Sequence, residues 1–541
     1  MEWMREQQYE GLPASSAIAM AVMERSGMRA MIDSLVKHAG DRKLTPGMAV
    51  KAMIGPIFDA RKKMPLSGVR HFYSAAPTDL LFGDGVTMES LNDNALARNL
   101  DDLYDHGLEK LFWGCSSMLK RRYGFDSKIR HMDSTNYTIH AIGPDNEGRA
   151  VPAFGGNAKD GRNDLLQYCA ATVTDGDRIL EYSKAYSGNT ADPVMDRETL
   201  EFLKRSLVPS ENTVIADCKL VNTSLITEMN DMGMGFISKL PAIFSDKVKE
   251  KVISSASSGV MDVSSLSGYE TYETEHETVC GKLRFIVYRS PGGIRKEMEY
   301  LKRQGRCDAE KRFKVFSKKK FACEADARLM FGEILGKHRD NAYIVSGEPI
   351  RTDEIIRRDS RGRPPKGTPS LGTRPYWKMD VSMEFSESRA IEIANVRSLS
   401  VIVTNLPFCS ADDENIRYGA TTDTVLRLYL DQYKVEHTYR LMKSGMGVDS
   451  VYVHTPSRAN ALLFVVSVAT LISSVMDAVL RRGARHKTVK QICIEMQNAL
   501  IEYVRGRDAM RVLGPKGSSD SVLSYLSLLG MDPSILLEID R

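Results

Sequence analysis

The sequence has little from which a sulfur-and-nitrogen metal centre or a disulfide framework could be built. It contains 8 cysteines and 10 histidines among 541 residues, but the cysteines form no CxxC pair and the histidines show no HxxxH spacing. Zinc sites and disulfide scaffolds depend on such spacings. We therefore exclude both classes and expect buried thiols in a reducing, cytoplasmic location.

Long apolar segments are also scarce. The first residues, MEWMREQQYEGLPAS, contain no apolar core of the kind that signal sequences have. The longest apolar run, Ala461 to Met476, is interrupted by Ser467, Thr470 and two further serines, and it is shorter than the roughly 20 apolar residues that span a bilayer. We expect this run to form a buried helix and the chain to have no membrane partner.

The chain has no strong excess of charge of either sign. Its formal net charge of +4 is too small to indicate a nucleic-acid partner by itself. The cations are clustered, but a charge run usually forms a solvated surface, so each cluster supports phosphate contact only weakly. The three clusters lie between Asp477 and Glu495, between Leu301 and Lys320, and between Arg351 and Arg374.

Hydrophobic periodicity predicts an α/β architecture. Helical spacing dominates up to about residue 125, where strand-like alternation begins with KIRHMDSTNYTIHA. Strands and helices then alternate, with a helix over 194–206 and short buried strands at NTVIAD and GFISKL. This order is typical of an α/β sheet with covering helices.

A mixed region interrupts this pattern before helical spacing returns near residue 422. It contains strand-like pieces, a charged helical stretch near 294–320 and a final strand, LSVIVTN. We interpret most of it as an insertion outside the sheet core. The expected segments are a helical region 1–125, a first core part 126–241, a β-rich insertion 242–400, a second core part 401–484 and a helical tail 485–541.

Two aspartates stand at strand positions that suit a ligand site. Asp133 lies within the first strand, on the face that alternation gives to Ile129 and His131. A charge in a half-buried strand is costly unless it is paired or binds a metal. Asp217 directly follows a parallel-type strand, at the edge where open α/β sheets bind ligands. Either aspartate alone could equally be a cap or a turn residue.

A third acid, Glu436, lies in the segment YLDQYKVEHTYRLMK. Successive residues of a helix are rotated by about 100°, so this acid lies on one stripe of the helix together with two phenols, an amide and two cations. A solvated face with helical ion pairs is the alternative interpretation. The stripe consists of Tyr429, Gln432, Glu436, Tyr439, Arg440 and Lys443.

Three carboxylates on a strand, at a strand end and on a helix suit two divalent cations. Mg²⁺ prefers oxygen ligands and leaves positions open for water and phosphate. Two such ions, about 3.5–4 Å apart, serve phosphodiester cleavage. Glycoside hydrolysis needs only two acids, but it predicts aromatic sugar platforms, and the chain has only 3 tryptophans.

Three blocks of sequence follow one another along the chain, and their combination in this order is specific. They are HMDSTNYTIHA; then GGNAKDGRNDLLQ with VIADCKLVN and GFISKLP; then YLDQYKVEHTYRLMKSGMGVDSVYVHTPSRANALLFV. They cover about 125–245 and 400–480. Together they resemble bacterial and archaeal insertion-sequence transposases, in the sixteen-thirty-four branch of the insertion-sequence-four superfamily. The resemblance implies an Asp-Asp-Glu triad on an RNase H-like mixed sheet with flanking helices, interrupted by a β-rich insertion domain.

Carried over to this sequence, the resemblance makes Asp133, Asp217 and Glu436 the catalytic residues and the ligands of two Mg²⁺ (or Mn²⁺) ions per active site. The ion between the two aspartates would activate the attacking oxygen. The ion shared by Asp133 and Glu436 would stabilise the leaving group.

The superfamily also has a Tyr-Arg-Glu-Lys signature with two, three and six intervening residues. Tyr429, Glu436 and Lys443 keep that spacing, but Gln432 stands where arginine is expected. Glutamine supplies neither the charge nor the fork of arginine, and Arg440 is a conjectural replacement. The DNA contacts that the resemblance implies are Tyr429, Gln432, Arg440 and Lys443, together with Lys159 and Arg162, for which a plain surface role is the alternative.

The resemblance implies a DNA transposase that binds terminal inverted repeats, cleaves the element ends and joins their 3′-hydroxyls to target DNA. It also implies double-stranded DNA as the partner, a DNA-binding role for region 1–125, a nucleoid-associated location in the cytoplasm and a homodimer as the active form. Two other classes stay open. A non-transposing RNase H-like nuclease would cut without joining ends, and a catalytically inactive DNA-binding relative would do neither.

Overall fold

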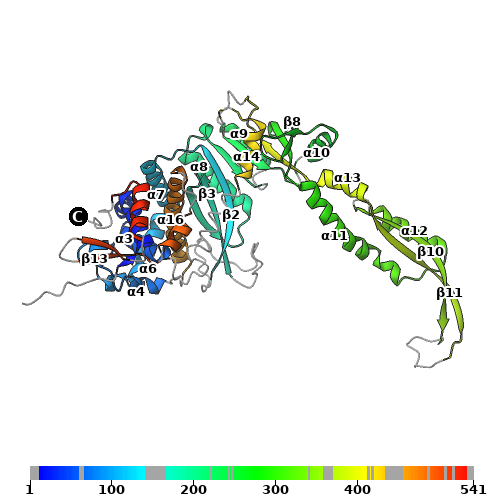
Figure 1. The fold of residues 1–541 in the computed structure, drawn as a ribbon, viewed down its shortest axis with the longest axis horizontal. Coiled ribbons are helices and arrows are strands. Elements are labelled where there is room, and N and C mark those ends of the chain that lie inside the picture. The colour runs from blue at the N-terminus through cyan, green and yellow to red at the C-terminus, as the bar shows by residue number, and fades with distance from the viewer. Residues whose placement is uncertain are drawn as a thin grey trace, which may run out of the picture. The chain divides into compact units, whose positions relative to one another are not determined.

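The computed structural model shows a mixed α/β protein (Figure 1). It divides into two compact units, which are described one at a time. Unit 1 comprises Met1–Pro241, Asn405–Ala420 and Arg427–Arg541, and unit 2 comprises Ala242–Thr404 and Thr421–Leu426. The structure describes residues 11–59, 66–139, 166–217, 222–241, 244, 248–338, 341–357, 369–410, 415, 419–432, 455–483, 488–496, 498–504, 509–513 and 518–532.

Five strands of unit 1 lie side by side in the order β4-β3-β2-β5-β6. β2 pairs antiparallel with β3 and parallel with β5, so the sheet changes direction at β2. Parallel neighbours need a crossover connection, and α8 (Asp192–Ser206) and α9 (Thr223–Asp231) lie in the connections into β5 and β6. The strands are β2 (Ile129–Ile139), β3 (Leu166–Asp175), β4 (Leu180–Ser187), β5 (Thr213–Ala216) and β6 (Gly235–Lys239).

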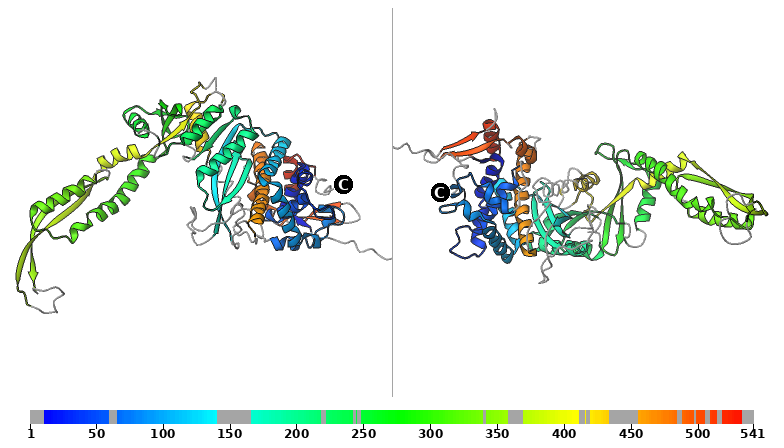
Figure 2. Two further views of the ribbon diagram at one scale, coloured as in Figure 1. Left: turned by 180° about the vertical axis from the view of Figure 1, so that it is seen from behind. Right: turned by 90° about the horizontal axis from the view of Figure 1, so that it is seen from below.

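A long helix, α16 (Pro456–Arg482), lies between this sheet and the N-terminal helices of unit 1 (Figure 2). Among the described helices it is long and apolar enough to cross a membrane, but 89% of its most apolar window is buried inside the protein. Its hydroxyls bond within the protein: Ser467 and Thr470 each donate to the carbonyl four residues earlier, at 2.9 Å. The expected buried helix is confirmed.

The N-terminal helices and the C-terminal segment pack with α16 around one hydrophobic core. Met20, Leu100, Leu471 and Leu526 are among its buried side chains, so both ends of the chain contribute. The N-terminal helices are α1 (Ala14–Arg25), α2 (Met28–Leu35), α3 (Pro46–Ile57), α4 (Val69–Phe72), α5 (Thr78–Phe82), α6 (Asp93–His106) and α7 (Leu108–Tyr123).

The expectation of a helical C-terminal tail is wrong in part. Between α17 (Val489–Glu495) and α18 (Ser518–Leu528) lie two antiparallel strands, β13 (Leu500–Val504) and β14 (Ala509–Leu513). The β-branched and aromatic residues of LIEYV suit a strand. The N-terminal β1 (Leu12–Pro13) supplies a further pairing partner for β13.

Unit 2 contains four strands in the order β12-β9-β8-β7, with antiparallel pairing between neighbours. It also contains several helices, so the expected β-rich character describes only a part of it. The strands are β7 (Asp262–Val263), β8 (Glu270–Thr278), β9 (Gly281–Arg289) and β12 (Leu399–Thr404). Two of its helices are α10 (Val248–Ser258) and α13 (Glu387–Arg397).

The rest of unit 2 forms what we call the arm (Figure 1). It consists of α11 (Gly293–Phe313), α12 (Glu324–Gly336) and the antiparallel pair β10 (Tyr343–Ile356) and β11 (Gly372–Phe385). Small apolar clusters join these elements: Phe313 and Phe316 pack with Val345 and Met379, and Leu301 packs with Ala342 and Ala390 of α13. The arm therefore has its own cores.

Candidate functional site

Asp133 lies in β2, the strand at which the sheet of unit 1 changes from antiparallel to parallel pairing. Its side chain is half-buried, and its Oδ1 accepts a hydrogen bond from the backbone N–H of Ser134 at 2.7 Å. On the antiparallel side it lies opposite Thr172. Asp133 is thus a carboxylate in the middle of the sheet rather than at a turn.

Asp217 directly follows β5, the strand that pairs parallel with β2. Ile129, Arg130 and His131 pair with Thr213, Val214 and Ile215, and Asp133 and Asp217 each come two residues after the last of these pairs. Continued by two residues, this register sets Asp133 level with Asp217, and residues in register on adjacent parallel strands point to the same face of a sheet. Two of the three predicted carboxylates thus stand at equivalent positions of neighbouring chain segments.

The end of β5 presents Asp217 to solvent. Its side chain is exposed, directly after the buried Ala216, and its backbone carbonyl accepts a hydrogen bond from Ser238 of β6 at 2.8 Å. The position agrees with the rule that open α/β sheets bind ligands at the carboxyl ends of their parallel strands. The site thus pairs a half-buried carboxylate with an exposed one.

Small polar residues lie beside Asp133 on the next two strands of the sheet, β3 and β4. Thr172 pairs with Asp133 and with Ser183 of β4, and the hydroxyl oxygens of Ser183 and of Ser467 in α16 lie 2.9 Å apart. The face that carries Asp133 is therefore the one that α16 covers. On the opposite face, Ser134 donates to Asp192 at the start of α8 at 3.1 Å.

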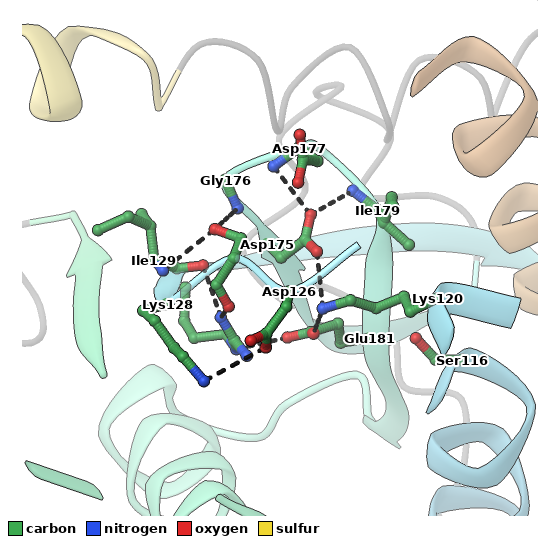
Figure 3. A network of polar contacts seen from close by, with 12 residues as sticks. Ser116, Lys120, Asp126, Lys128, Ile129, Asp175, Gly176, Asp177, Ile179 and Glu181 are labelled. Atoms are coloured by element: carbon green, nitrogen blue, oxygen red, sulfur yellow. Dashed lines mark hydrogen bonds and ion pairs between the residues drawn. The ribbon is translucent and has the colours of Figure 1, made fainter. Parts of the chain in front are cut away.

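Four buried charges fix the beginning of β2, three residues before Asp133. Figure 3 shows Lys120 of α7 between Asp175 and Glu181, with its Nζ 2.7 Å from Asp175 Oδ2 and in hydrogen-bond contact with Glu181. Arg130 of β2 places its Nε 2.6 Å from Glu181 Oε2. The network ties α7, β2, β3 and β4 together, so the strand that carries Asp133 is anchored at this end.

Burial raises the pKa of Glu181, and the charges of Arg130 and Lys120 lower it in part. Asp175 uses its other oxygen, Oδ1, to accept hydrogen bonds from the N–H groups of Asp177 and Ile179, both at 2.9 Å. The sequence analysis did not predict this network. The signal was the pair of charges, Arg130 and Glu181, inside segments that otherwise read as buried strands.

The helix expected to carry Glu436 ends early. α14 (Thr422–Leu430) contains Tyr429, but Asp431 and Gln432 form a turn. The N–H of Gln432 bonds to the carbonyl of Tyr429, three residues back, at 3.0 Å, which is the tight geometry of a helix end. The prediction of one continuous helix from Tyr429 is therefore wrong at this turn.

The remaining predicted site residues lie outside the described part of the chain. They are the catalytic candidate Glu436 and the DNA-contact candidates Arg440, Lys443, Lys159 and Arg162.

The donor chemistry of Asp133 and Asp217 fits a divalent cation. Two carboxylates in register offer the oxygen ligands that Mg²⁺ prefers, and the exposure of Asp217 leaves room for water and phosphate. Within the described ranges no group of three or more histidine, cysteine or acidic side chains could hold a metal ion. A third ligand, as the prediction of Glu436 requires, would have to come from elsewhere in the chain.

A cavity of about 510 Å³ opens beside β4 in unit 1. It lies between the edge strand and the helices α6, α7 and α16, with Ser183, Tyr186 and Ser467 among its lining residues. Neither Asp133 nor Asp217 lines it. The cavity is therefore separate from the pair of aspartates.

Comparison with known proteins adds a partial family match and a distant structural likeness. A family model described as "Domain of unknown function (DUF4277)" matches residues 15–117, which run from the second residue of α1 into α7. Comparison with curated proteins found no match. The fold is similar to "Cryo-EM structure of piggyBac transposase synaptic complex with hairpin DNA (SNHP)", with 7% identity, a TM-score of 0.40 and coverage of 97% of this chain and 85% of that chain. We draw no functional conclusion from likeness at that level.

Proposed function

We propose that this chain is a DNA transposase of an insertion sequence, with an RNase H-like catalytic core. The observation that carries the proposal is the parallel pairing of β2 with β5, because Asp133 and Asp217 each come two residues after the last pair, His131 with Ile215. The order of the strands supports it, since three antiparallel strands are followed by two parallel ones, as expected for an RNase H-like sheet.

Asp133, Asp217 and Glu436 would hold two Mg²⁺ or Mn²⁺ ions. When bound, such ions supply activation of an attacking oxygen and stabilisation of a leaving oxygen at a phosphodiester. The contribution of the chain is to hold its carboxylates in place. Asp133 pairs with Thr172 of β3, the residues just before it pair with β5, and the buried charges around Lys120 anchor the start of its strand.

The proposed reaction has two steps at phosphorus. In the first, a water oxygen attacks, the bond from phosphorus to the 3′ oxygen breaks, and a 3′-hydroxyl is released at the element end. In the second, that hydroxyl attacks a phosphodiester of target DNA and displaces the 3′ oxygen of the target strand. Because both ends of an element are processed together, the active form would be a homodimer on double-stranded DNA that carries terminal inverted repeats.

The test uses DNA that contains both flanks of the coding sequence, with Mg²⁺ or Mn²⁺, the full-length chain and two isosteric variants, Asp133→Asn and Asp217→Asn. We expect each variant to lose strand cleavage to the background level and to bind the DNA as tightly as the unchanged chain. Asp192→Asn is the matched control, because Asp192 bonds to Ser134 on the other face of the same strand. It should cleave normally.

The products separate the proposal from the two alternative classes. Joined products in which the 3′ end is linked to target DNA support a transposase, whereas cleavage without joining supports an RNase H-like nuclease. Binding without cleavage by the unchanged chain supports an inactive relative. Full cleavage by Asp133→Asn or Asp217→Asn would overturn the assignment of the site.

A further inference from the structure

We infer that α11 of the arm is a binding surface for duplex DNA. Its outward face carries residues at the spacing of one helical stripe, and none of them is acidic. The inference names a second contact to the DNA substrate of the proposed function and rests on that function. We call this surface the α11 stripe; it consists of Lys296, Tyr300, Arg303, Cys307, Lys311 and, just after the helix, Lys314.

The two faces of α11 differ sharply. Leu301, Gly305, Ala309 and Phe313 recur every four residues and are buried, whereas all six residues of the α11 stripe are exposed. The buried face fixes the helix against the arm, with Phe313 in one apolar cluster and Leu301 in another. The stripe is therefore held on a rigid element and points outward.

The four cations of the α11 stripe have no ion-pair or hydrogen-bond partner for their side chains among the described residues. Some other exposed cations of unit 2 are paired, for example Arg306 with Glu310 at 2.9 Å and Lys282 with Glu275 at 2.5 Å. Several unpaired cations on one stripe disfavour the free protein through like-charge repulsion. Binding of a polyanion relieves that repulsion.

The length and chemistry of the α11 stripe match a phosphate backbone. From Lys296 to Lys314 a helix rises about 27 Å, and duplex DNA carries one negative charge per roughly 1.7 Å of its axis. Protein partners are usually held by buried aromatic and apolar anchors, but the stripe offers only Tyr300. A membrane would need an apolar face beside the cations, and that face of α11 is buried in the arm.

The first experiment measures binding of the full-length chain to a labelled duplex of arbitrary sequence by fluorescence anisotropy, in EDTA and at several KCl concentrations. The stripe variant is Lys296→Gln, Arg303→Gln, Lys311→Gln and Lys314→Gln combined. The control variant is Lys282→Gln, Arg306→Gln, Lys320→Gln and Arg328→Gln combined, which removes the same charge from ion-paired positions of the same unit.

We expect the stripe variant to bind at least about tenfold more weakly and to show a shallower salt dependence, because each lost phosphate contact reduces the slope by about 0.9. The control variant should stay within about twofold. Equal weakening of both variants, or of neither, would overturn the inference. If the combined stripe variant does not fold, Arg303→Gln alone should still reduce the affinity and the slope, and unchanged values would overturn it.

The second experiment uses two exposed thiols of the arm. Cys307 lies on the α11 stripe, and Cys323 precedes α12. Excess duplex should slow alkylation of Cys307 severalfold and leave Cys323 unchanged. Three outcomes would contradict a DNA surface here. They are protection of both thiols, protection of neither thiol, and protection of Cys307 by polyglutamate to the same extent as by the duplex.

The outcomes for the surface and for the proposed function are separable. If the unchanged chain cleaves and joins DNA while the stripe and control variants bind alike, the function stands and the α11 stripe is not a DNA surface. If the stripe variant loses affinity and no cleavage is found, the surface stands and the proposed transposase activity fails.

Discussion

At the scale of single residues, Lys120 holds two buried carboxylates that would otherwise repel each other. Its side chain is 9% exposed, and it contacts Asp175 and Glu181, whose side chains are 0% and 3% exposed. Arg130 contacts Glu181 and is the second cation of this network of four charges. The position of β2, and with it Asp133, depends on this balance.

We therefore expect Lys120→Met to destabilise the protein by about 3–5 kcal/mol, because removing one partner of a buried ion pair leaves an uncompensated charge. The free energy of unfolding from urea denaturation measures this effect. Lys128→Met is the matched control, because Lys128 pairs with Asp126 at an exposed site, where such pairs contribute about 0–1 kcal/mol. A loss below about 1 kcal/mol for Lys120→Met would show that the network does not anchor β2.

The sequence predicted Asp133 and Asp217 because each stands at a strand position where a lone charge is unusual. It did not show that they are in register, since the pairing of β2 with β5 depends on the crossover between them. It also missed the network of Lys120, because helix α7 and strand β4 are far apart along the chain. Local patterns reveal where a charge is unusual but not which distant residue neutralises it.

At the scale of secondary-structure elements, long and strongly periodic segments were predicted well. The expected helix over 194–206 is α8, and the charged stretch near 294–320 is α11 with the short 3₁₀ turn that follows it. The strands β13 and β14 were missed because short apolar segments suit a helix or a strand equally until a partner strand is known. The partner of β13, β1, comes from the opposite end of the chain.

His338 joins three elements of the arm. Its side chain is 3% exposed, its ring packs edge-on against Phe313 of α11 at 5.2 Å, and its Nε2 lies 3.0 Å from the carbonyl oxygen of Tyr343 in β10. Burial, assisted by Arg312 and Arg389, lowers its pKa below the ordinary value of 6.5. The folded arm therefore favours the neutral ring.

Because the pKa of His338 is lower in the folded state, the unfolded state takes up the proton first on acidification. The stability that the neutral ring provides is present above pH 6.5 and is lost as the pH falls through the lowered pKa. We expect amide hydrogen exchange in α11 and β10, corrected for intrinsic rates, to become a few-fold faster between pH 7 and pH 5. His338→Gln keeps an N–H donor and should remove this dependence; an unchanged dependence would exclude His338 as its source.

At the scale of the whole molecule, segments near the two ends of the chain pair with each other in unit 1. β1 pairs with β13 through Leu12 and Ile501, and the N–H of Ala14 donates to the carbonyl of Ala499 at 2.9 Å. Buried residues from α1 and α18 lie in the same core. The N-terminal helices and the C-terminal segment, which the sequence suggested as separate regions, are therefore packed as one body.

Gly11 lies where these two ends approach most closely. A Cβ added there would be 1.7 Å from the carbonyl oxygen of Ile501, whereas one added at Gly40 would meet nothing within 4 Å. We expect Gly11→Ala to force β1 away from β13 and to destabilise unit 1 by about 1–3 kcal/mol, the usual range for overpacking, with Gly40→Ala near neutral. Urea denaturation followed by Trp113, in α7 of the same unit, measures both variants. Equal free energies of unfolding for the two variants would show that the close packing of β1 on β13 does not contribute to the stability of unit 1.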